Sequence, residues 1–241
     1  MKRFTAQDGH ERLWFDPGEI EEIMEYELQK ANLFPSLENP VVDIEVFIEQ
    51  HLLAHLDQHA NLDATTLGVT EFRAGAKPLV KINKDLTNSA LDEEGGPPYL
   101  VGRWRATLAH EGAHIILHRR LFNLNPQQRG FFDTGEEPYP EPNRLLRCLK
   151  RDVCFGGNSK NWREIQANMG MAAILMPGAV FAEAFQQELG QANLARVERD
   201  SPEARQLATS LGAKFQVSRQ AAQIRLQTLG LLAIPGQLEL M

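Results

Sequence analysis

Cysteine is scarce in this chain of 241 residues: the two present, Cys148 and Cys154, are too few for a disulfide scaffold. No apolar run approaches the ~20 residues of a membrane-spanning helix. Residues 1–8 lack the apolar core of a secretory signal. A net charge of −7 does not favour nucleic acid as the main partner. These absences predict a cytoplasmic protein without a membrane partner, with cysteines that are free thiols.

The most informative segment present is Leu108–His118, LAHEGAHIILH, which carries the pattern H-E-x-x-H in an apolar, helix-compatible stretch. His110 and His114 are four residues apart, so a helix places both imidazoles on one face, where they can bind one zinc ion. Glu111 is then beside the open metal position and can accept a proton from bound water. The pattern indicates metal-assisted hydrolysis, most often of a peptide bond.

A catalytic zinc site needs a third protein ligand. His118 continues the same stripe, but it lies about 12 Å along the helix from His110, too far for both to bind one ion. It is expected to support or pack against the site. Glu164 is the better candidate, because it opens an apolar helix that can pack on the motif helix. The alternative explanation for Glu164 involves no metal: a negatively charged side chain near a helix N-terminus is stabilised by the helix dipole.

Other side chains are candidates for roles around the metal. Asn168 lies one turn after Glu164 and can hydrogen-bond a ligand or the substrate. A tetrahedral oxyanion needs a further donor, and the sequence does not choose among the candidates Tyr99, Tyr139, His118 and Arg163. The strand expected near Leu79–Ile82 is a candidate for holding an extended peptide by edge addition.

Periodicity and capping residues predict an α+β fold that is mostly helical, with a small antiparallel or mixed sheet. Asp16, Pro17 and Glu19 predict the start of a first helix, and Asp43 the cap of a second, although 41–46 also fits a strand. Further helices are expected at 102–121, 161–176, 178–189, 202–214 and 219–229, and strands at 67–72 and 79–82. The expected units are an N-terminal helical extension (1–40), a metal-binding domain (41–190) with an irregular inserted loop (123–160), and a C-terminal helical part (191–241).

Two separated motifs together resemble the ImmA/IrrE family of zinc metallopeptidases. They are Arg105–His114, RATLAHEGAH, and Glu164–Pro177, EIQANMGMAAILMP. The strand segments LGVT and VKIN and the helical end extend the resemblance over about Val41–Leu232. It implies a gluzincin-like domain in which His110, His114 and Glu164 bind one Zn²⁺ and Glu111 is the general base.

The same resemblance implies a protein substrate, namely a helix-turn-helix repressor in a stress response or in mobile-element regulation. The chain departs from the family pattern in two places. Gly112 stands where leucine is common, and the 123–160 insertion is longer than usual.

A non-catalytic role is the alternative, in which the metal stabilises a regulator that binds a repressor or DNA. It is motivated by the helix-turn-helix-like end, since residues 204–238 contain four basic side chains and no acidic ones. Direct nucleic-acid binding is not expected, because four basic charges make a weak footprint. Several apolar residues there also look like core.

Overall fold

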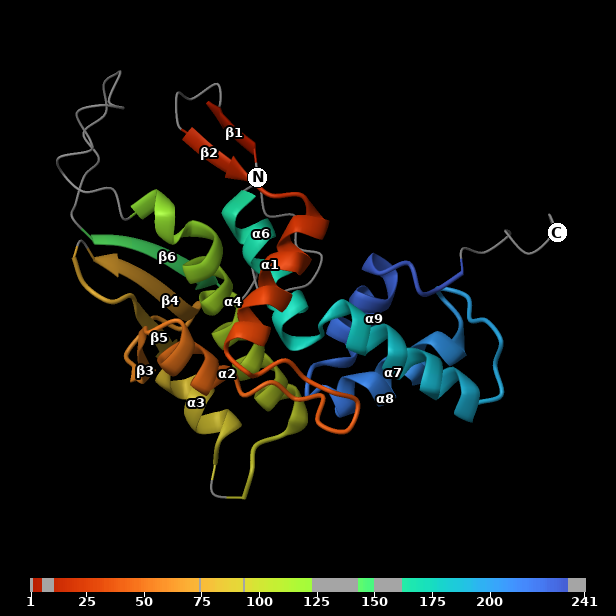
Figure 1. The fold of residues 1–241 in the computed structure, drawn as a ribbon. Helices are drawn as coiled ribbons and strands as arrows, with labels where there is room; N and C mark the ends of the chain where they lie inside the picture. The colour runs from red at the N-terminus through yellow and green to blue at the C-terminus, as the bar shows by residue number, and fades with distance from the viewer. Residues whose placement is uncertain are drawn as a thin grey trace.

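The computed structural model describes residues 2–5, 11–73, 75–92, 94–122, 143–149 and 162–233. They form an α+β fold in which a long helix, α4, lies between a small sheet and α6, whereas α3 packs against the sheet itself (Figure 1). The helices are α1 Pro17–Lys30, α2 Ile44–Val46, α3 Lys84–Ala90, α4 Pro98–Phe122, α6 Trp162–Leu175, α7 Gly178–Gln191, α8 Pro202–Lys214 and α9 Arg219–Thr228, with a π-helical turn η1 Phe47–His51. The strands are β1 Lys2–Thr5, β2 Glu11–Trp14, β3 His55–Ala60, β4 Thr66–Arg73, β5 Leu79–Asn83 and β6 Asn143–Leu149.

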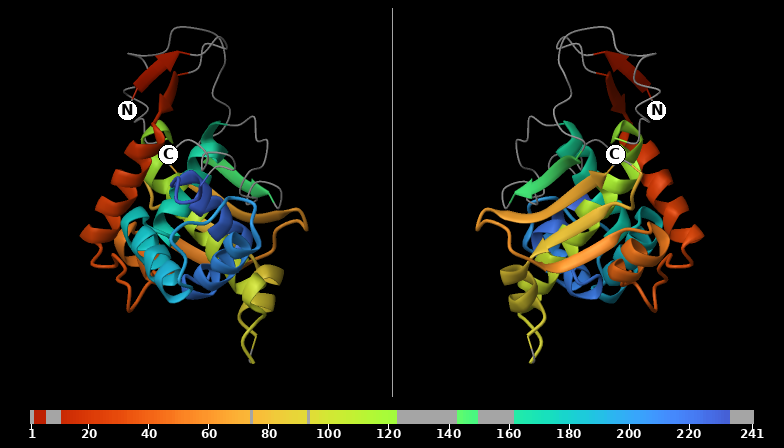
Figure 2. Two further views of the ribbon diagram at one scale, coloured as in Figure 1. Left: turned by 90° about the vertical axis from the view of Figure 1, so that its right-hand side faces the viewer. Right: turned by 90° about the vertical axis from the view of Figure 1, so that its left-hand side faces the viewer.

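The main sheet has the strand order β3-β5-β4-β6, with β3 parallel to β5 and the other pairs antiparallel. It is therefore mixed, as predicted. Figure 2 shows that the helices lie behind one face of this sheet, where α4 crosses it. Strands β1 and β2 form a separate hairpin.

Two sequence predictions about the sheet are wrong. The segment Leu79–Ile82 cannot add a peptide at its edge, because β5 is already paired on both sides, with β3 and with β4. The 123–160 stretch is not irregular throughout, because Asn143–Leu149 forms β6 and pairs with β4. The edge strands of this sheet are β3 and β6.

Local capping explains where the first helices begin. At α1 the Asp16 backbone N–H donates to Glu19 at 2.9 Å, which completes the predicted capping box. At α2 the Asp43 carboxylate accepts from the backbone N–H of Val46 at 3.1 Å. The helical conformation of Ile44–Val46 excludes the competing strand at 41–46.

Helix α4 is packed on both sides, which buries the motif. Gly170 of α6 lies where α4, α6 and α1 come together. A Cβ atom added at Gly170 would lie 2.8 Å from the Cβ of Ala113 and 2.8 Å from the Cε of Met24. The absence of a side chain at this position lets α6 approach α4 closely enough for their polar side chains to meet.

The C-terminal helices join the same core. Arg225 of α9 donates from Nε and Nη2 to the carbonyl oxygen of Met176, at 2.9 and 2.7 Å. Its Nη1 lies 2.5 Å from Oε1 of Glu21 in α1. Buried apolar residues from all three sequence-predicted units form one cluster. No single helix in the described ranges is long and apolar enough to cross a membrane; α6 and α7 together have the length and composition, but they are bent by 57° at the break between them.

Candidate metal centre

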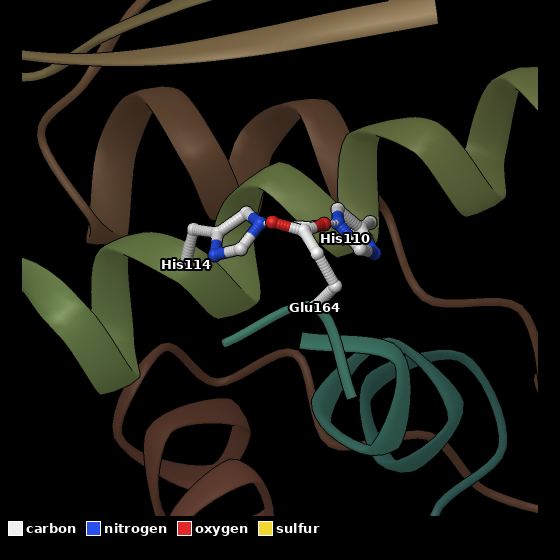
Figure 3. A group of neighbouring side chains, drawn as sticks. All are labelled: His110, His114 and Glu164. Carbon is white, nitrogen blue, oxygen red and sulfur yellow. Dashed lines mark hydrogen bonds and ion pairs between the residues drawn. The ribbon is translucent and has the colours of Figure 1, made fainter. Parts of the chain in front are cut away.

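Three side chains from α4 and α6 converge on one point inside the molecule. Glu164 of α6 reaches between the two histidines of α4 (Figure 3). Its Oε2 lies 3.0 Å from His110 Nε2 and 3.5 Å from His114 Nε2, and the two Nε2 atoms are 3.0 Å apart. Tetrahedral zinc with bonds of about 2.1 Å has ligand atoms about 3.4 Å apart. The three residues could therefore hold one metal ion.

The protonation states of His114 and Glu164 suit metal binding. Both histidines are fully buried, and Glu164 is 4% exposed. Burial lowers the pKa of His114 to about 4, so its imidazole is neutral at pH 7. Burial alone would raise the pKa of Glu164, but its hydrogen bonds with His110 and His114 outweigh this effect and hold the pKa below its usual range. His114 thus offers a neutral imidazole, and Glu164 an ionised carboxylate, as donors at pH 7.

Each of the two histidines has a partner at its Nδ1 nitrogen. His110 Nδ1 lies 3.0 Å from Oδ1 of Asn168. His114 Nδ1 lies 3.0 Å from Nδ1 of His118, whose Nε2 is 3.2 Å from Oε1 of Gln166. Asn168 and His118, which the sequence suggested as supporting residues, therefore lie in contact with His110 and His114. Gln166 was missed, because a residue two places after Glu164 does not share its helix face.

Glu111 lies beside the ligand cluster and is fully buried. Its Oε2 accepts a hydrogen bond of 2.5 Å from the Thr70 hydroxyl on β4, whereas its Oε1 has no hydrogen-bond partner among the described residues. Burial raises the pKa of Glu111 to about 8, although His110 and the Thr70 hydroxyl both act to lower it. A buried polar atom without a partner is costly in a folded protein, and a reacting water or substrate would satisfy it.

Gly68 on β4 provides the space that the Glu111 carboxylate fills. A Cβ atom at Gly68 would lie 2.6 Å from Glu111 Oε1 and 2.8 Å from Thr107 Cγ2. Gly68→Ala is expected to displace Glu111 and to lower the free energy of unfolding by about 1–3 kcal/mol, a typical cost of overpacking. Thermal and denaturant unfolding would measure this loss.

Gly112, inside the motif, supplies the matched control. A Cβ atom there would meet only Leu52 and Ile48, at 3.6 and 3.7 Å, which is ordinary contact. Gly112→Ala is expected to stabilise α4 by about 0.5–1 kcal/mol. Equal stability of the two variants would contradict the close approach of β4 to Glu111.

The remaining predicted residues have different outcomes. The Cζ of Arg163 lies 5.2 Å from the centre of the Trp162 ring, which in turn packs edge-on against His118. Tyr99 is 62% exposed at the start of α4 and lines a separate cavity of about 550 Å³ with the α8–α9 turn. It is therefore not part of the centre. Tyr139 and Cys154 lie outside the described residues.

The chain shows no significant match to a protein-family model, to a curated protein or to a solved structure. What it does has to be inferred from the chemistry of these side chains.

Proposed function

We propose that this protein is a zinc-dependent peptidase of the gluzincin type, with His110, His114 and Glu164 as ligands and Glu111 as general base. The observation that carries the proposal is the Oε1 of Glu111, which is buried beside three candidate ligands and has no hydrogen-bond partner within the described part of the chain. Structural zinc sites are closed by four protein ligands, whereas catalytic sites have three and keep one position open. Two histidines and one glutamate are a known catalytic set.

Each side chain has a definable task in peptide hydrolysis. Bound zinc would polarise the scissile carbonyl and acidify a water molecule. Glu111 Oε1 takes the proton from the attacking water and passes it to the leaving amine. The Thr70 hydroxyl holds the other carboxylate oxygen, so the base keeps its orientation. Arg163 is a candidate donor to the oxyanion of the tetrahedral intermediate. Burial is the main cause of the lowered pKa of His114 and of His118, but the charge of Arg163 also contributes to both, so this side chain lies near the centre.

The proposed substrate is a protein, and a helix-turn-helix repressor is the first to test. This choice rests on the resemblance of the two motifs to the ImmA/IrrE family. The motifs supply the residues that meet at the centre: His110, Glu111 and His114 from the first, and Glu164, Gln166 and Asn168 from the second.

A non-catalytic, metal-stabilised regulator is the second candidate, and the burial of the site favours it. The ligand histidines and Glu111 have no exposed surface, so hydrolysis requires the site to open. Direct DNA binding gains less support. Arg225, one of the four basic residues at the C-terminal end, is 5% exposed and paired with Glu21.

Metal removal separates these two functions. The zinc-loaded protein is incubated with a helix-turn-helix repressor and, separately, with a proteome-derived peptide library, and new N-termini are identified by mass spectrometry. We expect cleavage that stops on chelation and returns when zinc is restored. Bound zinc with no new N-termini in either sample would instead support the non-catalytic regulator.

A further inference from the structure

The two ligand histidines are connected to α6 in different ways. His110 contacts the amide oxygen of Asn168 directly, at 3.0 Å. His114 reaches the amide oxygen of Gln166 only through the intervening ring of His118, by steps of 3.0 and 3.2 Å. Helix α6 therefore supplies one ligand, Glu164, and the terminal partner of each ligand histidine.

The direction of these hydrogen bonds follows from the chemistry of the imidazoles. A histidine that binds a metal through Nε2 must carry its proton on Nδ1. His114 then donates from Nδ1, and the Nδ1 of His118 must accept, because only one proton fits between two nitrogens that are 3.0 Å apart. His118 in turn carries its proton on Nε2, where the Oε1 of Gln166 lies at 3.2 Å and can accept it.

We propose that His118 and Gln166 form a relay that holds His114 in its metal-binding tautomer and orientation, and thereby set the affinity of the centre for zinc. The inference rests on the zinc site of the proposed function, not on hydrolysis. In this proposal His118 is a positioning residue: it acts on the centre through His114 and does not bind the ion itself.

The surroundings of His118 fit this role. The residue is fully buried. Its ring packs edge-on against Trp162, with centroids 5.5 Å apart, and is tilted by 46° to the ring of His114. Packing thus restricts the ring to an orientation in which both nitrogens meet partners. Such outer partners typically change metal affinity by about 10- to 100-fold when they are removed.

The acceptor oxygen of Gln166 can be tested without any substrate. Gln166→Met preserves the length of the side chain and removes the acceptor, whereas Gln166→Glu keeps an oxygen there. The dissociation constant for zinc is measured by competition with a chromophoric chelator. We expect Gln166→Met to bind zinc about 10- to 100-fold more weakly and Gln166→Glu to bind at least as tightly as the wild type.

Variants of His118 test the other step of the relay. Asparagine at this position can place its oxygen near the site of Nδ1 and accept from His114, whereas phenylalanine cannot. We expect His118→Asn to bind zinc more tightly than His118→Phe, and the d–d absorption bands of bound Co²⁺ to shift in the weaker variants. His51→Phe is the matched control, since it replaces a partly buried histidine that pairs with Glu27 outside the centre, and it should leave the zinc affinity unchanged.

The outcomes are separable. The relay is overturned if Gln166→Met binds zinc as the wild type does, or if that variant does not fold and the two His118 variants bind zinc equally. Far-UV circular dichroism of the metal-free proteins establishes folding. Failure of hydrolysis leaves these affinity differences in place, and failure of the relay leaves zinc-dependent cleavage in place.

Discussion

Glu111→Gln is expected to remove hydrolysis while zinc stays bound. Loss of a general base typically lowers the rate by about 10²- to 10⁴-fold, because an amide cannot take a proton from water at neutral pH. Glu111 does not belong to the ligand group, and glutamine is nearly isosteric. Its amide oxygen can still accept the hydrogen bond that Thr70 donates. Product formation and bound zinc, measured on the same sample, check both parts.

Glu71→Gln is the matched control for this substitution. Glu71 is also a buried glutamate, 6% exposed on β4, but it pairs with Arg73 and Lys81 at 2.9 and 3.1 Å. Its replacement should leave the rate close to that of the wild type. If Glu111→Gln inactivates a repressor as fast as the wild type, the protein acts by binding and not by hydrolysis.

Glu111→Gln should also change how the stability of the metal-free protein depends on pH, and this effect can be measured without an activity assay. Burial raises the pKa of Glu111 from 4.5 to about 8 in the metal-free protein. The folded state therefore binds an extra proton between these pH values, and stability is lost as the pH rises through this window. Glutamine cannot ionise, so metal-free Glu111→Gln should gain stability relative to the wild type between about pH 5 and 8. Unfolding curves recorded across this range measure the difference.

Much of the helical framework could be predicted because its signals are local. Pro202 and Lys214 bound the predicted and the observed α8 alike, and α6 differs from its prediction by one residue at each end. The proximity of His110 and His114 follows from helix geometry alone. Helix α4 begins at Pro98, four residues before the predicted start. Proline is favourable in a first helical turn, but the Gly- and Pro-rich sequence here is typical of a loop.

The missed parts are those without a local pattern. Strand β3, HLDQHA, lacks the alternation of apolar and polar residues that is typical of a strand, and three of its six positions are exposed. Its pairing with β5 is therefore set by tertiary structure. The contacts of Thr70 with Glu111 and of Gln166 with His118 join residues 41 and 48 positions apart. No periodicity encodes such contacts, and they become visible only when β4, α4 and α6 are packed together.

The ligand assignment predicts how metal binding responds to each substitution. Replacing both His110 and His114 with alanine should abolish zinc binding. Glu164→Ala should greatly weaken it, because among the described residues Glu164 is the one ligand candidate from a second element. His118→Ala should weaken binding without abolishing it, because its Nδ1 is bonded to His114.

Zinc-dependent stability gives a second readout of the same assignment. A ligand present at a thousandfold excess over its Kd stabilises the folded state by about 4 kcal/mol. For a chain of this size, each kcal/mol corresponds to about 2–4 °C in Tm. The wild type should therefore melt roughly 8–16 °C higher with zinc than without it, and the double histidine variant should show no shift. If His118→Ala loses the shift while Glu164→Ala keeps it, the third ligand is His118 and the proposed coordination is wrong.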